Sequence, residues 1–258
     1  VTTSISAGRR HAPSRLVLVR HGESIGNVAD RTARQRGEGR LDLDERDADV
    51  ALSDTGGEQA RAVGAYLARL GNDERPTVVL SSPYRRGHDT AREAIAHLGD
   101  SLSVTVDERL RERDLGAFDG LTGSGIRELD PSEADRRSKV GKFYYRPPGG
   151  ESWCDVALRT RSLLTEIRQE YDGERVWVFS HQAVIMSFRF VLEGLDEHAL
   201  LAIDADTPMA NCSLTTYVRD EGGALVLESY GDTVAVDQAP ADVTHEPKKA
   251  GQGETAVS

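Results

Sequence analysis

Short apolar runs rich in Val, Ile and Leu alternate along the chain with longer segments whose apolar residues recur every three or four positions. The first pattern is typical of buried strands and the second of amphipathic helices. Strands are predicted at 15–20, 76–82, 102–106, 175–180, 212–218 and 224–229. Helices are predicted at 55–70, 85–98, 152–171 and 182–194. Because strands that alternate with helices are joined by crossovers, this order predicts an α/β fold with parallel strands.

Stretches without apolar periodicity define the predicted domain boundaries. Residues 1–13 and 234–258 are rich in Ala, Gly, Pro, Thr and charge, so both are predicted to be disordered tails. One domain is predicted between them, at 14–233. Within it, the segment from about 121 to 148 is predicted to be a helical insertion, and the highly charged connection 30–54 has no predicted role.

Composition narrows the class of protein. The 258 residues include 32 Lys and Arg and 43 Asp and Glu, and the resulting net charge of −11 argues against nucleic-acid binding through phosphate contacts. No apolar stretch approaches the roughly 18–20 residues that span a bilayer, and residues 1–13 lack the apolar core of a signal peptide. Cys154 and Cys212 are too few for a disulfide scaffold. We therefore expect a cytoplasmic protein without membrane or nucleic-acid partners, and the oligomeric state is not indicated.

Three predicted strands end in residues suited to phosphate chemistry. Arg20 and His21 end the first strand, while His181 ends a later one. Arg86 follows another strand, at the start of a helix, where the dipole and free backbone amides favour an anion. The carboxyl ends of neighbouring parallel strands share one crevice. An arginine offers a fixed fork of donors to a phosphate, and a neutral imidazole can attack phosphorus, so the pattern favours transfer through a phosphohistidine.

Five blocks of the sequence, in order, resemble the histidine phosphatase superfamily, which contains the phosphoglycerate mutases and many phosphatases. The blocks are 18–24 with Asn27, 81–86 continuing to 91, 109–112 with Gly116 and Gly120, 147–152, and 178–181. The resemblance implies a three-layer α/β/α fold with a mostly parallel central sheet, like that of phosphoglycerate mutase. The segment 142–152 and Gln182 look closer to the phosphatase and fructose-2,6-bisphosphatase branch than to the mutases.

The resemblance also implies a role for each matching residue. His21 is the expected nucleophile, Glu112 the acid that protonates the leaving oxygen, and His181 a cation that helps to hold the phosphoryl group. The expected phosphate-binding residues are Arg20, Arg86, Asn27 and Gln182, and the expected specificity residues are Lys142, Tyr145 and Arg146. Arg86, not the adjacent Arg85, matches the family position. The attacking nitrogen of His21 is expected to stay unprotonated because the N–H of the other ring nitrogen donates to a backbone carbonyl oxygen.

The expected function is a metal-independent phosphomonoesterase that acts on small phosphorylated metabolites such as sugar phosphates, without a cofactor. The histidines are scattered and the two cysteines lie far apart, so no metal site is predicted. One alternative is a mutase-type isomerase, although residues 28–32 depart from the aromatic and small residues of mutases. The other is a non-catalytic module that binds phosphorylated ligands, which would not need His21, Glu112 and His181 together.

Overall fold

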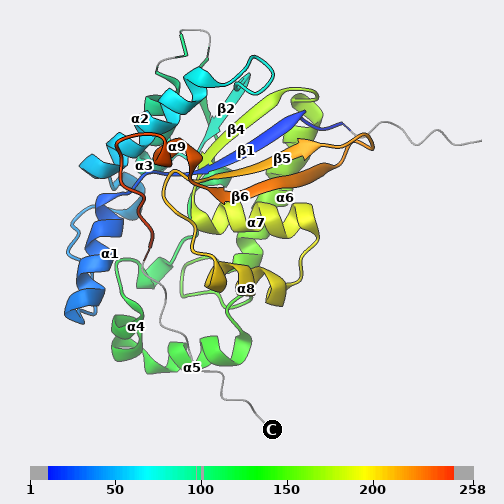
Figure 1. The fold of residues 1–258 in the computed structure, drawn as a ribbon. Coiled ribbons are helices and arrows are strands. Elements are labelled where there is room, and N and C mark those ends of the chain that lie inside the picture. The colour runs from blue at the N-terminus through cyan, green and yellow to red at the C-terminus, as the bar shows by residue number, and fades with distance from the viewer. Residues whose placement is uncertain (1–10, 97, 100–101, 247–258) are drawn as a thin grey trace, which may run out of the picture.

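Six strands form the central sheet of the computed structural model, which describes residues 11–96, 98–99 and 102–246 (Figure 1). They are β1 (Arg15–Arg20), β2 (Val78–Ser81), β3 (Val104–Val106), β4 (Arg175–Ser180), β5 (Leu214–Arg219) and β6 (Leu225–Asp232). Their spatial order is β3-β2-β4-β1-β5-β6. Of these six strands, β5 alone runs against its neighbours. The predicted α/β fold with a mostly parallel sheet is therefore confirmed.

The three strands that were expected to carry the chemistry are neighbours. β4 pairs in parallel with β1 on one side and with β2 on the other. Arg20 lies opposite Ser180, and Ser81 lies opposite Phe179. The residues that follow these strands therefore start from one edge of the sheet, the edge at which open α/β folds bind ligands.

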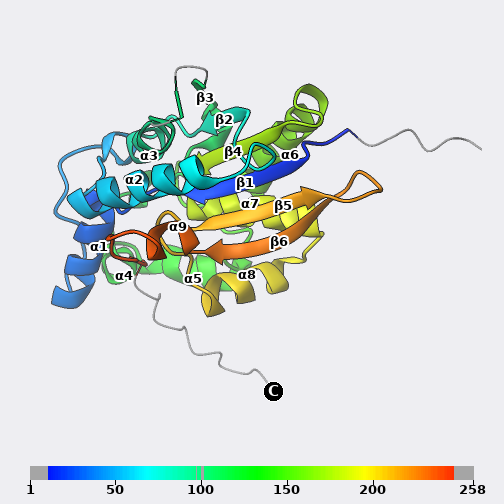
Figure 2. The ribbon, with the colours of Figure 1, turned by 45° about the horizontal axis from the view of Figure 1, so that its top comes forward.

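Helices cover both faces of the sheet (Figure 2). The helices are α1 (Ile25–Arg36), α2 (Asp54–Arg69), α3 (Arg85–Ile95), α4 (Gly123–Leu129), α5 (Pro131–Val140), α6 (Trp153–Glu170), α7 (Gln182–Glu193), α8 (Glu197–Asp206) and α9 (Val234–Asp237). α6 and α7 pack on one face, whereas α2, α3 and α9 pack on the other. α4 and α5 lie in the segment where a helical insertion was predicted.

Alternate residues of β1 contact the two helical layers. Leu16 and Leu18 belong to the apolar cluster that includes α6 and α7, and Val17 and Val19 to the cluster that includes α2 and α3. A strand covered on both faces buries every side chain, which explains its continuous apolar run. Each such side chain contributes about 1.5–3 kcal/mol of burial free energy. β1 is therefore a firm support for the residues at its end.

The sequence pattern predicts neither α1 nor α8. The reason is that α1 buries only Ala33 and α8 only Leu200, so neither presents an apolar stripe. α1 begins instead with a capping box, in which Ser24 Oγ accepts from the backbone of Asn27 and Asn27 Oδ1 accepts from the backbone of Ser24.

Residues 234–246 depart from the predicted disordered tail. Ala235 and Val236 of α9 are fully buried in the cluster with α2 and α3. The pattern missed them because one short turn carries too few apolar residues to show a period. The rest of that predicted tail, 247–258, and most of the other, 1–10, lie outside the described residues.

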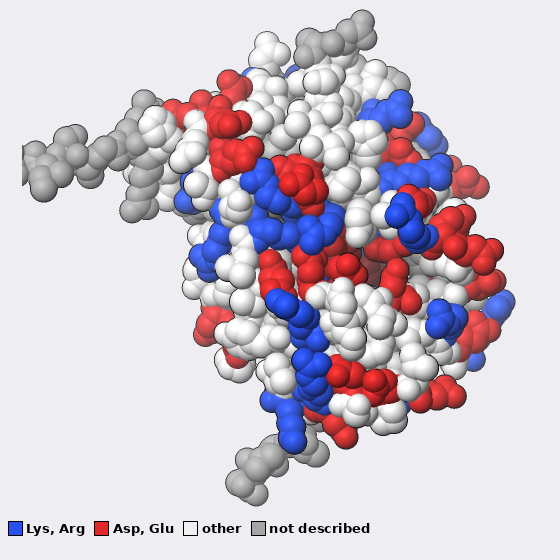
Figure 3. All heavy atoms as spheres, turned by 180° about the vertical axis from the view of Figure 1, so that it is seen from behind, with Lys and Arg blue, Asp and Glu red and all other residues white. Residues whose placement is uncertain are grey.

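No helix of the described chain is both long and apolar enough to cross a membrane. Figure 3 shows the face opposite that of Figure 1, on which Lys and Arg form narrow groups bordered by Asp and Glu. Basic groups on that face therefore lie close to countercharges.

Candidate active site

Arg20 and His21 lie at the carboxyl end of β1, and both are almost completely buried. His21 Nδ1 lies 2.7 Å from the carbonyl oxygen of Gly22. Because a carbonyl oxygen only accepts, Nδ1 carries the proton and the neutral ring keeps a lone pair on Nε2. Burial, and then the charges of Arg86 and Arg20, lower the pKa of His21 well below its ordinary value. His21 thus has the backbone acceptor for Nδ1 that was expected, and its role as nucleophile stays a prediction.

Gly22 lets the loop after β1 pack tightly against the start of α2. A Cβ at this position would lie 2.6 Å from the carbonyl oxygen of Gly56, which is too close for any side chain. The backbone N–H of Gly22 also donates to Thr90 Oγ1 on α3, at 3.0 Å. Contacts from two helices therefore fix the direction of the His21 ring.

His181 follows β4 and is fully buried beside His21, with the ring centroids 5.0 Å apart. Its Nε2 lies 2.8 Å from Ser82 Oγ, whereas Nδ1 is buried without a hydrogen-bond partner among the described residues. Burial lowers the pKa of His181 well below its ordinary value, and the charge of Arg86 lowers it further. Burial and the nearby arginines therefore favour the neutral ring in the free site. The role of His181 as a cation that holds a phosphoryl group stays a prediction.

Arg86 and Arg85 differ sharply in exposure at the start of α3. The side chain of Arg86 is 6% exposed and that of Arg85 is 60% exposed. Arg86 donates to the carbonyl oxygen and to Oδ2 of Asp47, at 2.6 and 3.2 Å, and its guanidinium lies 5.3 Å from the centre of the Tyr84 ring. Arg85 pairs with Asp89 at the surface, at 3.4 Å. Arg86 is thus the arginine that faces inward, in agreement with the sequence register.

The carboxylate of Glu246 contacts Arg20 and Asn27, two of the residues expected to bind phosphate. Arg20 Nη2 forms an ion pair with Oε1 of Glu246, and Asn27 Nδ2 lies 3.4 Å from the same oxygen. Arg20 Nη1 donates to the carbonyl oxygen of Met209, while Nε is buried without a partner among the described residues. Arg20 and Asn27 therefore converge on one anionic oxygen.

Glu112 lies just after a 3₁₀ turn, Glu108–Leu110, that is tied to the sheet. Ser180 Oγ at the end of β4 donates to the carbonyl oxygen of Leu110, at 2.8 Å. Burial raises the pKa of Glu112, although the backbone N–H of the next residue and the charge of Arg86 oppose this rise. A carboxyl group with a raised pKa keeps its proton closer to neutral pH, as a general acid requires.

Arg159 on α6 is a positioning residue that the sequence did not reveal. It donates to the carbonyl oxygens of Arg109 and Glu112, at 2.5 and 3.3 Å, and pairs with Glu151 at 3.1 Å. Its side chain therefore joins the acid-bearing block to the block at 147–152. Nothing in the sequence marks an arginine in the middle of a helix for such a role.

Gln182 and Lys142 share a protein partner. Gln182 Nε2 donates to Oδ1 of Asp204 at 2.7 Å, and Lys142 Nζ donates to Oδ2 of the same residue at 2.6 Å. The amide nitrogen expected to hold phosphate is thus bound to a carboxylate in this structure.

Tyr145 and Arg146 are also engaged with carboxylates. The hydroxyl of Tyr145, a buried residue, donates to Glu133 at 2.7 Å. Arg146 Nε donates to Asp155 at 2.8 Å on an exposed surface. The structure therefore gives Tyr145 and Arg146 structural contacts, and their assignment to substrate recognition stays a prediction.

Two further arginines have no such partner among the described residues. The side chains of Arg113 and Arg137 are half-buried and form no hydrogen bond or ion pair with another described residue. Burial is the main cause that lowers the pKa of each guanidinium. The charge of Glu112 raises the pKa of Arg113, and the charge of Arg137 lowers it. The charge of Arg127 lowers the pKa of Arg137. Half-buried arginines without a partner among the described residues are candidates to bind an anionic group.

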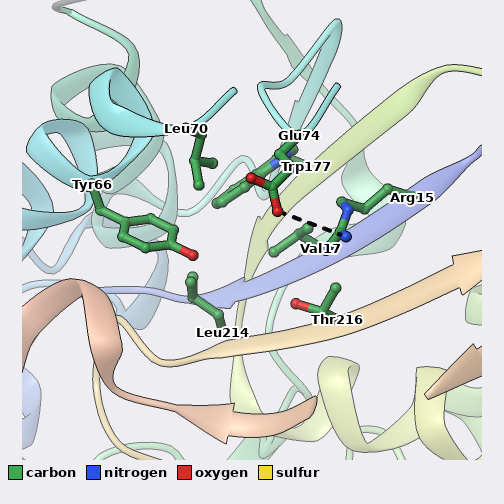
Figure 4. A pocket seen from close by; sticks show the side chains of 8 residues that line it. All are labelled: Arg15, Val17, Tyr66, Leu70, Glu74, Trp177, Leu214 and Thr216. Atoms are coloured by element: carbon green, nitrogen blue, oxygen red, sulfur yellow. Dashed lines mark ion pairs between the residues drawn. The ribbon is translucent and has the colours of Figure 1, made fainter. Parts of the chain in front are cut away.

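The hollow drawn in Figure 4 is separate from this site. It lies beside Arg15, the first residue of β1, and so at the opposite end of that strand from His21. Arg15 and Glu74 form an ion pair across it, at 3.9 Å. Its volume of about 20 Å³ is enough for about one water molecule and too small for a substrate. Among the described residues, no group of three or more His, Cys, Asp or Glu is placed to hold a metal ion.

Comparison with known proteins matches residues 16–233 to the family model of the histidine phosphatase superfamily (branch 1). A bifunctional protein of Mycobacterium tuberculosis is 37% identical over 188 residues, which cover 72% of this chain and 46% of that protein. Glucosyl-3-phosphoglycerate phosphatase of the same organism is 37% identical over 153 residues, which cover 59% of this chain and 60% of that protein. The chain thus spans about half the length of the curated relatives that it matches.

A solved structure supports the same likeness. The native structure of mycobacterial glucosyl-3-phosphoglycerate phosphatase superposes with a TM-score of 0.66, at 29% sequence identity. The superposition covers 85% of this chain and 99% of that one. The agreement in fold therefore extends over most of the chain.

Proposed function

Since the chain belongs to the histidine phosphatase superfamily (branch 1), we propose that it is a phosphomonoesterase that works through a phosphohistidine on His21. One observation carries the proposal. The proton of the neutral His21 ring is held on Nδ1 by the carbonyl oxygen of Gly22, so the reactive lone pair is on Nε2. The same ring is 5.0 Å from that of His181 and close enough to Arg86 and Arg20 for their charges to lower its pKa.

The first step transfers the phosphoryl group to the protein. The lone pair of His21 Nε2 forms a bond to phosphorus while the bond from phosphorus to the leaving oxygen breaks. Glu112 gives its proton to that oxygen, so the product leaves as a neutral alcohol. Arg20 and Arg86 hold the non-bridging oxygens, and fixed positive charge of this kind supplies most of the stabilisation in phosphoryl transfer.

The second step returns the enzyme to its starting state. Water attacks phosphorus, the bond from phosphorus to His21 Nε2 breaks, and the carboxylate of Glu112 accepts the proton of the water. His21 is again neutral, Glu112 is again protonated, and inorganic phosphate leaves. His181 completes the set: a bound dianion offsets the positive charges that keep it neutral, so its ring gains a proton and a second donor.

We propose that the substrates are small phosphorylated metabolites with a second anionic or hydroxylated part, such as sugar phosphates. Arg113 follows Glu112 directly, and the charge of Arg137 reaches it. Half-buried arginines without a partner among the described residues suit a carboxylate or a second phosphate. The name of glucosyl-3-phosphoglycerate phosphatase, one of the relatives, describes a substrate of this kind.

A substrate screen tests this function. Sugar phosphates, phosphoglycerates and phosphopeptides are incubated with the protein, and both inorganic phosphate and phosphorylated products are measured. Release of inorganic phosphate that disappears in His21→Ala is the expected result. Isomerised phosphoglycerate in place of free phosphate would identify a mutase instead. Tight binding of a phosphorylated compound without turnover would identify a non-catalytic module.

A further inference from the structure

The segment 242–246 is docked onto the active-site loops by buried polar groups. Gln59, which is fully buried, donates to the carbonyl oxygen of Asp242 and to Thr244 Oγ1, at 2.7 and 2.9 Å. Asn211, which is 1% exposed, donates its backbone N–H to the carbonyl oxygen of Thr244 at 2.9 Å and accepts from Thr244 Oγ1 at 3.1 Å. Buried polar groups are costly unless they are paired, so these contacts fix the segment at Thr244.

The same two anchors also hold the loop of the nucleophile. Gln59 Oε1 accepts from the backbone N–H of Glu23 at 2.8 Å, and Asn211 Nδ2 donates to the carbonyl oxygen of His21 at 3.0 Å. The segment 242–246 therefore lies directly beside the loop that contains His21 and Glu23.

Glu246 extends from this anchor to the phosphate-binding residues. One of its carboxylate oxygens, Oε1, contacts both Arg20 and Asn27. Arg20 is completely buried, its Nη1 donates to the carbonyl oxygen of Met209, and its Nε has no partner among the described residues. Glu246 holds Nη2, the terminal nitrogen of Arg20 that is not bound to the backbone. A phosphoryl oxygen bound by both Nη2 and Asn27 Nδ2 therefore needs the position of this carboxylate oxygen.

We propose that Glu246 is an internal competitor of the substrate, which occupies the phosphate position on Arg20 and Asn27 and leaves it when a phosphomonoester binds. This inference rests on the proposed function, because it concerns regulation of the same site. The side chain of Glu246 is 37% exposed, so it has a path to solvent. Thr244 stays anchored meanwhile, and the displaced carboxylate remains at a high effective concentration. The substrate thus binds only the fraction of molecules in which Glu246 has moved out, and its apparent affinity is lower in proportion.

The test compares Glu246→Gln with Glu228→Gln. Glu228 is a matched control, since it is 46% exposed and pairs with Arg15 at the other end of β1. The dissociation constant of inorganic phosphate is measured by calorimetry, first in the wild-type background and then with His21→Ala added. Glu246→Gln is expected to tighten phosphate binding about tenfold in both backgrounds, and Glu246→Ala to do the same. Glu228→Gln is expected to leave it unchanged.

Turnover supplies a second measurement on the same variants. Glu246→Gln is expected to lower KM by the same factor as the phosphate dissociation constant, with kcat nearly unchanged. Unchanged or weaker phosphate binding in both Glu246 variants would overturn the inference and make Glu246 an ordinary surface acid or an aid to binding. The binding measurement does not depend on turnover, so the two proposals can fail separately. If Glu246→Gln binds phosphate more tightly but the protein hydrolyses no substrate, the proposed function is refuted and the inference about Glu246 stands.

Discussion

Replacing Arg86 by alanine removes a buried cation from the centre of the site, whereas the same change at Arg85 removes an exposed one. Arg86 is 6% exposed and holds Asp47 in the free protein, and Arg85 is 60% exposed. A two-nitrogen, charge-assisted clamp on a phosphoryl group is worth about 2–4 kcal/mol in the transition state, or roughly 30- to 900-fold in kcat/KM. Asp47 would also be left unpaired near the incoming dianion, which acts in the same direction.

The pH profile gives a second measure of the same change. After burial, Arg86 is the largest cause that lowers the pKa of His21. Removing this charge raises the pKa of His21, and the attacking ring must be neutral. The acidic limb of kcat/KM against pH is therefore expected to move to higher pH in Arg86→Ala.

Arg85→Ala is the matched control for both measurements. Its partner Asp89 lies at the surface, and exposed ion pairs contribute little, so kcat/KM is expected to change by less than about threefold without movement of the acidic limb. Steady-state kinetics over the pH range on a sugar phosphate decides the matter. Equal losses in the two variants, or a larger loss in Arg85→Ala, would show that the inward arginine has been assigned to the wrong position.

Three further predictions follow from the proposed chemistry. His21→Ala is expected to raise the barrier by about 4–8 kcal/mol, and acid-labile, base-stable label from a phosphorylated substrate is expected on the wild type alone; substantial turnover by the variant would rule out His21 as nucleophile. Glu112→Gln is expected to slow hydrolysis of a sugar phosphate by roughly 100-fold or more but p-nitrophenyl phosphate much less, since only the poor leaving group needs a proton; equal losses on both would point to a structural role. Arg137→Ala is expected to raise KM about tenfold for a substrate with a second anionic group and to leave KM for p-nitrophenyl phosphate unchanged; the same KM change on both substrates would contradict a subsite for that group.

The sheet and its catalytic edge were predictable because their signal is local and strong. Leu16 to Val19 are buried on both faces, so the strand is an uninterrupted apolar run that ends next to His21, the proposed nucleophile. β1, β2 and β4 are parallel neighbours, so the candidate residues that follow them lie at the same edge of the sheet. The inward arginine could also be predicted from its position after the strand. In the first helical turn after β2, Arg86 faces inward and Arg85 faces solvent.

The rest depends on contacts between distant parts of the chain, which one sequence does not show. Lys142 and Gln182 looked available for a substrate, but both donate to Asp204 on α8, a helix that the pattern did not predict. α1 was missed because its single buried residue gives no period. Glu246 lay in a segment that reads as a disordered tail by composition.

The position of β1 in the sheet has a consequence for how the protein is made. Its hydrogen-bonding neighbours are β4, which begins at Arg175, and β5, which begins at Leu214. At ordinary translation rates of about 5–20 residues per second, β1 stays unpaired for on the order of 10–30 s before either neighbour has been synthesised. An unpaired apolar strand is a template for association with other chains. Yield of active protein should therefore depend on chaperone capacity and growth temperature, and His21 reaches its position in the site only after these later strands have been made.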